Sequence, residues 1–128
     1  MIKTIAGTGT CGYNGDGQLA TLAHLNYPNG VHVHNGHVYF SDSYNHRVRM
    51  ILPNGMIKTI AGTGIGGIGG DGELATESPV GIFVDDSGIY MCFDNDMRIR
   101  KVDSNGIITT IIGYHCESHP TDGKERNS

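Results

Sequence analysis

The sequence predicts an all-β protein built from about two antiparallel, four-stranded units. Three observations support this fold class. Nearly identical segments recur roughly 50 residues apart, which is the spacing of a repeat architecture. Each repeat holds four short runs of alternating polar and apolar residues between turn signals. Glycine makes up 20 of the 128 residues, more than twice its average usage, as expected for a chain with many tight turns.

The repeat is clearest where two segments match letter for letter. Residues 1–9 and 56–64 both read MIKTIAGTG, and the same offset continues through the Gly-Asp-Gly segments at 15–17 and 70–72. From Pro28 and Pro79 onward the offset is shorter by four residues, because the first copy has a longer loop. A partial third copy occupies residues 106–113.

Each repeat divides into four predicted strands. In the first repeat, Asn35-Gly36 is a strong two-residue hairpin signal, since both positions tolerate positive φ. The predicted strands of the two repeats are 31–34, 37–41, 47–52 and 56–61, then 81–85, 88–92, 97–102 and 107–112. Residues 2–6 repeat 57–61 and are predicted to form one additional outer strand. Four antiparallel strands in about 50 residues form the unit of a β-propeller, a blade.

The glycine-rich connections are predicted to be structural. A phosphate-binding loop needs Lys-Ser/Thr after its last glycine, whereas Asp16 and Asp71 stand in these loops and would repel an anion. One carboxylate per loop is too few for Ca²⁺, which takes six to eight oxygen ligands. We expect Asp16 to cap a turn and residues 18–25 to form one or two helical turns over the blade edge.

Two segments of the first repeat resemble the NHL repeat. They read LNYPNGV at 25–31 and VYFSDSYNHRVR at 38–49, which match a Pro-x-Gly-Val start, a strand ending in Asp-Ser, and Asn-His-Arg-Val-Arg. The resemblance covers residues 1–113 but is weaker in the second repeat, where Phe93, Asp96 and Met97 replace Asp42, Asn45 and His46. It implies a partial NHL-type β-propeller of about two blades, whereas most such propellers have six.

The resemblance also suggests what the chain does. NHL propellers mostly act as platforms for partner proteins, some bind RNA across one face, and a related propeller lyase uses metals on its axis. We therefore expect a non-enzymatic protein-interaction module, with an RNA-binding face or a metal-dependent lyase or lactonase as alternatives. The residues 114–128 lie outside the resemblance, and their polar composition predicts a disordered tail.

The candidate interaction or inter-blade residues are polar side chains of the repeat: Asp42, Asn45, His46, Arg47, Arg49, Arg98 and Arg100. Arg-x-Arg on one strand face could bind nucleic acid. The net charge of −4 and the few aromatic residues beside these arginines argue against RNA. We expect the guanidinium groups to bridge Asp42, Asp94 or loop carbonyls between blades, and His46 to hydrogen-bond its turn to neighbouring backbone.

The sequence indicates no catalytic, metal or cofactor site. No nucleophile–base arrangement stands out, and the three cysteines (Cys11, Cys92 and Cys116) are expected to be free thiols. His32 and His34 share one strand face, but Phe83 and Asp85 occupy the equivalent positions of the second repeat, which favours inter-blade packing over zinc binding. No apolar run is long enough to span a membrane, and the compartment is not indicated.

Two blades are too few to close a ring. We therefore expect further repeats in a longer protein or, alternatively, three copies that close one ring. Phe83 and Val84 are predicted to be buried, while the loop at 62–72 and the tail are predicted to be the most mobile segments. Several strand residues are expected to supply exposed apolar surface: Val31, Val33, Ile82, Val84, Ile89, Ile99, Val102 and Ile108.

Overall fold

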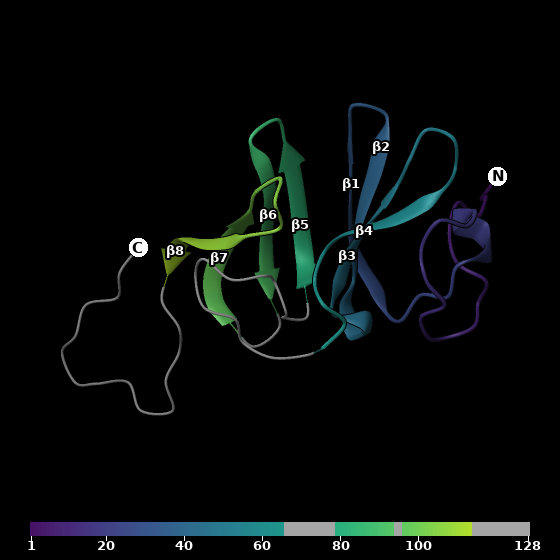
Figure 1. Ribbon diagram of the computed structural model, residues 1–128, viewed down its shortest axis with the longest axis horizontal. Coiled ribbons are helices and arrows are strands. Elements are labelled where there is room, and N and C mark those ends of the chain that lie inside the picture. Colours follow the sequence, from purple (N-terminus) through teal and green to yellow (C-terminus); the bar gives the residue numbers. More distant parts are fainter. Residues whose placement is uncertain (66–78, 94–95, 114–128) are drawn as a thin grey trace.

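Two four-stranded antiparallel sheets stand side by side in a computed structural model that describes residues 1–65, 79–93 and 96–113 (Figure 1). In each sheet the strands follow chain order, β1-β2-β3-β4 and β5-β6-β7-β8. The predicted all-β fold of two propeller blades is confirmed. The strand bounds are β1 (Pro28–His34), β2 (His37–Asp42), β3 (Arg47–Ile51), β4 (Ile57–Ala61), β5 (Pro79–Asp85), β6 (Gly88–Phe93), β7 (Asp96–Val102) and β8 (Ile108–Gly113).

The turns between the strands form where the sequence indicated them. Asn35 and Gly36 both have positive φ, 49° and 76°, as a two-residue hairpin requires. Most strand ends lie within one residue of their predicted positions. Strand β1 begins earlier than predicted, at Pro28, because an irregularity between Pro28 and Val31 lets Pro28 still pair with Asp42.

The two blades pack face to face. The first sheet contributes Val48 and Ala61, with Tyr39 and Ile60 partly buried beside them. The second sheet contributes a larger apolar set, namely Val84, Ile89, Met91, Phe93, Val102 and Ile108, with Ile82 partly buried beside it. The predicted exposure of Val84, Ile89, Val102 and Ile108 was therefore wrong, because the first blade covers this face.

The N-terminal segment covers the opposite face of the first blade. Ala20 and Ala23 pack against Phe40, Ile51 and Ile57. Ala20 lies in a single 3₁₀ turn, η1 (Ala20–Leu22), which falls inside the predicted 18–25 segment.

Residues 2–6 do not form the predicted outer strand. Strand β3 is already paired with β2 and β4. The outer edge of β4 is occupied as well, because Gly17 donates to the Ile57 carbonyl and Ile57 donates to that of Gln18, both over 2.9 Å. At Ile57 the outer edge of β4 is therefore not available to residues 2–6.

The far face of the second blade is open among the described residues. Ile99 and Ile112, which pair with each other, are exposed there, and Phe83 on the innermost strand is 53% exposed although its ring also contacts His32 of the first blade. The prediction that Phe83 is buried was wrong, because its side chain is half exposed beside His32. Val84 was predicted both to be buried and to add to the exposed surface; it is buried, because adjacent strand residues point to opposite faces of the sheet. Val31 and Val33 are exposed as expected.

Several expectations lie outside the described residues: those for Asp71, Asp94, Cys116, most of the 62–72 loop and the tail at 114–128. Among the described helical turns, none is long and apolar enough to cross a membrane.

Candidate functional site

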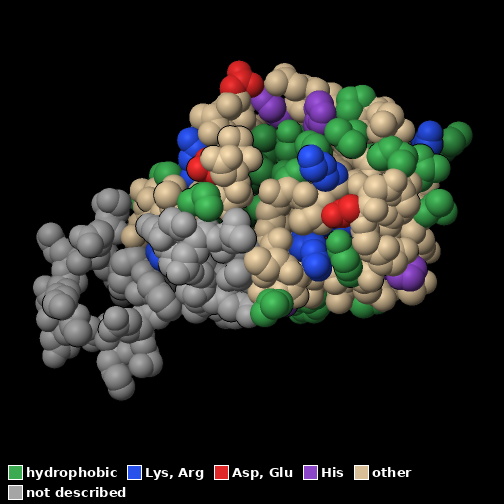
Figure 2. Space-filling model, viewed as in Figure 1, with side chains coloured by type: hydrophobic (Ala, Val, Ile, Leu, Met, Phe, Trp, Pro, Cys, Tyr) green, Lys and Arg blue, Asp and Glu red, His purple; other side chains and the backbone are tan. Residues whose placement is uncertain are grey.

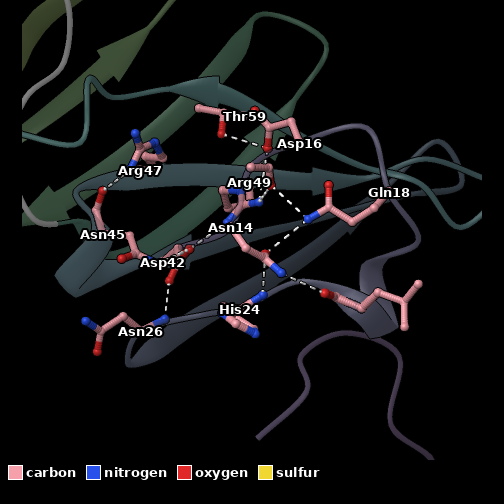
Figure 3. Close-up of polar contacts among 12 residues, drawn as sticks. Asn14, Asp16, Gln18, His24, Asn26, Asp42, Asn45, Arg47, Arg49 and Thr59 are labelled. Carbon is pink, nitrogen blue, oxygen red and sulfur yellow. Dashed lines mark hydrogen bonds and ion pairs between the residues drawn. The ribbon is translucent and has the colours of Figure 1, made fainter. Parts of the chain in front are cut away.

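The polar residues of the first repeat form a buried network around Asp42 (Figure 3). The Asp42 carboxylate accepts hydrogen bonds from Arg49 Nη1 (2.8 Å), Asn45 Nδ2 (2.9 Å) and the Asn26 backbone N–H (2.7 Å). Asp42 ends β2, and the antiparallel register places Phe40 opposite Arg49, so the two charged groups meet on one sheet face. Arg49 and Asp42 form the expected bridge, but it lies within the first blade and not between blades.

Arg49 also binds the Gly-Asp-Gly loop. Its Nη2 donates to the Gly15 carbonyl (2.9 Å) and to Asp16 Oδ1 (3.0 Å), and the whole residue is inaccessible to solvent. The guanidinium group thus lies between two carboxylates, which compensates the cost of burying its charge.

Asp16 is a site residue that sequence reasoning placed in the wrong role. The Asp16 carboxylate, expected to cap a turn, accepts hydrogen bonds from Arg49 Nη2 and from Thr59 Oγ1 (3.1 Å). A usable signal exists in the sequence, because Gly-Asp-Gly and the buried arginine recur together in both repeats, at 16 and 49 and again at 71 and 100.

The other predicted residues have different surroundings. The His46 backbone N–H donates to the Ser43 carbonyl (3.0 Å), which closes the turn η2 (Ser43–Asn45). Arg98 donates to Thr110 Oγ1 (3.3 Å), and Arg100 is fully buried. Arg47 donates to the Asn45 carbonyl (3.1 Å) and lies 3.7 Å above the Tyr13 ring. The expected lack of aromatic residues beside these arginines was wrong, because Tyr13 reaches Arg47 from a distant loop.

Hydrogen bonds and ring contacts also join the two blades. Ser41 Oγ accepts from the Gly30 N–H (2.8 Å) and donates to the Val80 carbonyl (3.0 Å), while Ser43 Oγ donates to the Pro79 carbonyl. The His32 ring lies 4.6 Å from that of Phe83, which confirms the expected inter-blade packing of His32.

At the hairpin tips, His34 Nε2 lies 2.8 Å from Asp86 Oδ1, a further contact between blades. Within the described part of the chain, no three His, Cys, Asp or Glu residues gather as a metal site would require.

Three tyrosines, Tyr13, Tyr27 and Tyr44, surround this network at the β2–β3 end of the first blade. The Tyr27 and Tyr44 rings are stacked, with centroids 4.8 Å apart and planes 19° from parallel. Their exposed fractions are 62% and 59%, and that of Tyr13 is 39%. Together with Arg47 they form what we call the tyrosine surface.

The buried network fixes the loops that carry these rings. Asn26, next to Tyr27, donates its N–H to Asp42, and its carbonyl accepts the Tyr44 N–H (3.0 Å). Asn45 Nδ2 binds both Asp42 and the carbonyl of Gly12, the residue before Tyr13 (2.8 Å). The motif residues are therefore a scaffold, and the tyrosines are what the scaffold exposes.

The backbone at Tyr27 is strained. Its φ is +60°, in the left-handed region that bulky residues avoid, and Pro28 follows it. Such a conformation costs about 1–3 kcal/mol and persists only where neighbouring contacts determine it. The ring contact of an aromatic pair stabilises the fold by about 0.5–1.5 kcal/mol, which offsets only part of this strain.

Sequence reasoning missed the tyrosine surface because its residues lie in three separate loops. One signal was available: the second repeat has Ile68, Ser78 and Asn95 at the positions of Tyr13, Tyr27 and Tyr44, while it retains the arginines. The aromatic set is therefore particular to the first repeat.

The charged side chains on the face seen in Figure 2 do not form a basic stripe among the described residues. On the face seen in Figure 2, Lys and Arg side chains occur as separate patches with hydrophobic and acidic side chains between them. Arg49 and Arg100 are inaccessible.

Comparison with known proteins agrees with this architecture. A family model described as the NHL repeat matches residues 25–50. Human (Homo sapiens) teneurin-4 is 38% identical over 95 residues, which cover 61% of this chain and 3% of teneurin-4. The chloroplastic protein SUPPRESSOR OF QUENCHING 1 of Arabidopsis thaliana is 33% identical over 87 residues, which cover 63% of this chain and 8% of that protein. The chain thus spans less than a tenth of the length of these curated relatives.

Two solved structures from Bacteroides thetaiotaomicron VPI-5482 have a similar fold. One is a structural genomics protein of unknown function, with a TM-score of 0.56 and 20% sequence identity. The match covers 80% of this chain and 25% of that protein. The other is an auxiliary nutrient binding protein, with a TM-score of 0.52 and 21% sequence identity. The match covers 83% of this chain and 28% of that protein. At such low identity the likeness shows the fold alone.

Proposed function

We propose that this chain, which carries NHL-type β-propeller blades, is a non-enzymatic binding module whose ligand is a partner protein. One observation carries the proposal. Asp42, Arg49 and Arg100 of the repeat motif are buried inside the blades, whereas a set of aromatic side chains on hydrogen-bonded loops stays exposed at the end of the first blade. Tyrosine and arginine are enriched where proteins bind one another.

The hydrogen bonds of Ser41, Ser43 and Asp42 favour a binding role. Ser41 and Ser43 hydrogen-bond to backbone carbonyls of the next blade. Asp42 is bound by three donors and has no solvent access. Side chains held in this way position loops and do not act as a nucleophile or a base.

RNA binding is the second candidate, and the contact between Arg47 and Tyr13 is what favours it, since stacking and positive charge together suit single strands. The net charge of −4 and the two inaccessible arginines weigh against it. Phosphate contacts require several accessible Lys or Arg side chains.

The test is a selection experiment with the whole chain. The immobilised protein is presented with a phage-displayed random peptide library, and in parallel a single-stranded RNA pool is titrated by filter binding at low and moderate salt. We expect enrichment of related peptides that compete with one another, and only weak RNA retention. Salt-sensitive RNA binding in the micromolar range without peptide enrichment would refute the proposal.

A further inference from the structure

We infer that the tyrosine surface is the ligand site of this module and that it binds an extended, proline-containing segment of a partner protein that also carries an acidic residue. This inference rests on the proposed function, because it names the surface and the ligand chemistry of the same module. It rests on four features: the exposure of Tyr13, Tyr27 and Tyr44, the fixed placement of their loops, the strained backbone at Tyr27, and the charge of the partly buried Arg47.

Exposure comes first. The stacked Tyr27 and Tyr44 rings leave flat apolar surface and two phenol groups open to solvent. Among the described aromatic residues outside this surface, Phe40 and Phe93 are buried, Tyr39 and Tyr90 are partly buried, and only Phe83 is similarly exposed, at 53%. Exposed and adjacent tyrosines offer a large contact area at a low cost in side-chain entropy.

Placement and strain come next. The loops that hold the three rings are bound to one buried framework, Asp42 with Asn45 and Arg49, so the rings do not need to be ordered when a ligand binds. Tyr27 nevertheless has φ = +60°, where glycine or asparagine would fit with less strain. A bulky residue kept in a strained, exposed loop position indicates selection for function.

The ligand chemistry follows from the rings and the charge. Proline rings pack on aromatic side chains, and proline-rich segments are extended before binding, with carbonyls free to accept hydrogen bonds from phenol groups. Among the described residues Arg47 contacts no carboxylate: it donates to the Asn45 carbonyl and lies above Tyr13. An acidic ligand residue would supply that missing partner.

The experiment uses the full chain and four labelled probes measured by fluorescence anisotropy. They are a proline-rich peptide with one aspartate, its proline-to-alanine version, its aspartate-to-lysine version, and a single-stranded RNA. We expect the first peptide to bind, and the two altered peptides to bind about tenfold more weakly or worse.

Four variants locate the site. Tyr27→Gly and Tyr44→Ala should weaken peptide binding by about tenfold or more, and Tyr44→Phe should retain most of it. Tyr27→Gly should leave the midpoint of thermal unfolding unchanged or higher, since glycine accepts this φ without strain. Phe83→Ala is the matched control, because Phe83 is a similarly exposed aromatic residue of the second blade whose ring contact is with His32 and not with the tyrosine surface.

The outcomes separate this inference from the proposed function. Peptide binding that both tyrosine variants leave intact, or selected peptides that lack proline, would overturn the inference while the module remains a protein binder. Binding of RNA that the same variants weaken would assign the surface to nucleic acid. Failure of every peptide, selected or designed, would overturn both.

Discussion

Arg49 is a buried cation whose two carboxylate partners come from different parts of the chain. Asp42 belongs to the same sheet, whereas Asp16 belongs to the loop that covers it. The network thus joins the N-terminal segment to the first blade. Removing one partner from a buried ion pair leaves a charge without compensation, and this costs much more than the pair contributes.

Asp42→Ala is therefore expected to destabilise the protein by about 3–5 kcal/mol, measured by urea unfolding. The variant also frees the loops of Tyr27 and Tyr44, because the Asn26 and Asn45 hydrogen bonds end on the same carboxylate. The control is Asp86→Ala, whose side chain is 90% exposed beside His34 and should change stability very little. Equal effects of the two variants would contradict the assignment of Asp42 as the centre of the network.

Asp85 provides a prediction about pH. The Ser87 hydroxyl, followed by the Ser87 backbone N–H, donates hydrogen bonds to its carboxylate and lowers its pKa below the ordinary aspartate value. Because the pKa is lower in the folded state, this turn adds stability above the unfolded-state pKa and loses it as the pH falls through the folded-state pKa. Titration by NMR should give a pKa for Asp85 below its usual range, and Ser87→Ala should raise it.

At the residue scale, some side-chain contacts could be predicted from the sequence and others could not. The Arg49–Asp42 pair was predictable because both residues lie in one motif on antiparallel strands. The Tyr27–Tyr44 stack was not, because it depends on a left-handed backbone conformation that tyrosine rarely adopts. Local propensity fails at such positions because tertiary contacts determine the conformation.

At the scale of elements, alternation and turn residues determined the strands well, whereas pairing depended on which edges were free. Residues 2–6 have the same letters as 57–61, yet only the second copy is a strand, β4. The difference is the neighbour: β4 pairs with β3, while the edge beyond β4 is taken by residues 17–19. A strand is defined by its partner, which the repeat alone does not supply.

Gly62, directly after β4, permits a close approach of the chain to the β2–β3 turn. Its φ is +98°, and an added Cβ would lie 2.1 Å from the His46 carbonyl oxygen, a backbone atom that cannot rotate away. Gly62→Ala should therefore cost more than the roughly 1–3 kcal/mol of backbone strain alone. Gly9→Ala is the matched control, since Gly9 has a similar φ of +87° with nothing within 4 Å. Thermal unfolding should place the Gly62 variant below the Gly9 variant, and the reverse order would contradict the predicted clash.

At the scale of the whole molecule, the blades repeat but their environments do not. In the first blade, one sheet face is covered by the N-terminal segment. In the second blade, the corresponding sheet face is covered by the first blade. What remains open is the far face of the second blade, with Phe83, Ile99 and Ile112. Repeats of this kind bury their apolar faces only against neighbours, so the terminal face is where they associate.

This open face predicts how the protein behaves in solution. Phe83 is 53% exposed, so Phe83→Ala should cost less than about 1.5 kcal/mol, well below the loss for a buried phenylalanine. A charge on the same face, Phe83→Asp or Ile99→Asp, should lower both self-association in sedimentation and the binding of a dye for exposed apolar surface, without loss of the fold.

Val84→Asp is the contrasting variant, because Val84 is the next residue along β5 but points into the contact between the blades. It buries an unpaired charge and should unfold the second blade. The two positions test the alternation of faces directly.

If Phe83→Asp were as damaging as Val84→Asp, the far face would have to be covered in solution by another copy of the chain. Sedimentation of the unchanged protein would then show a stable oligomer. If the unchanged protein sediments instead as a monomer and binds the dye, the open face is unfilled, and a further blade is the surface that fits it, because the first blade already packs its corresponding face in this way.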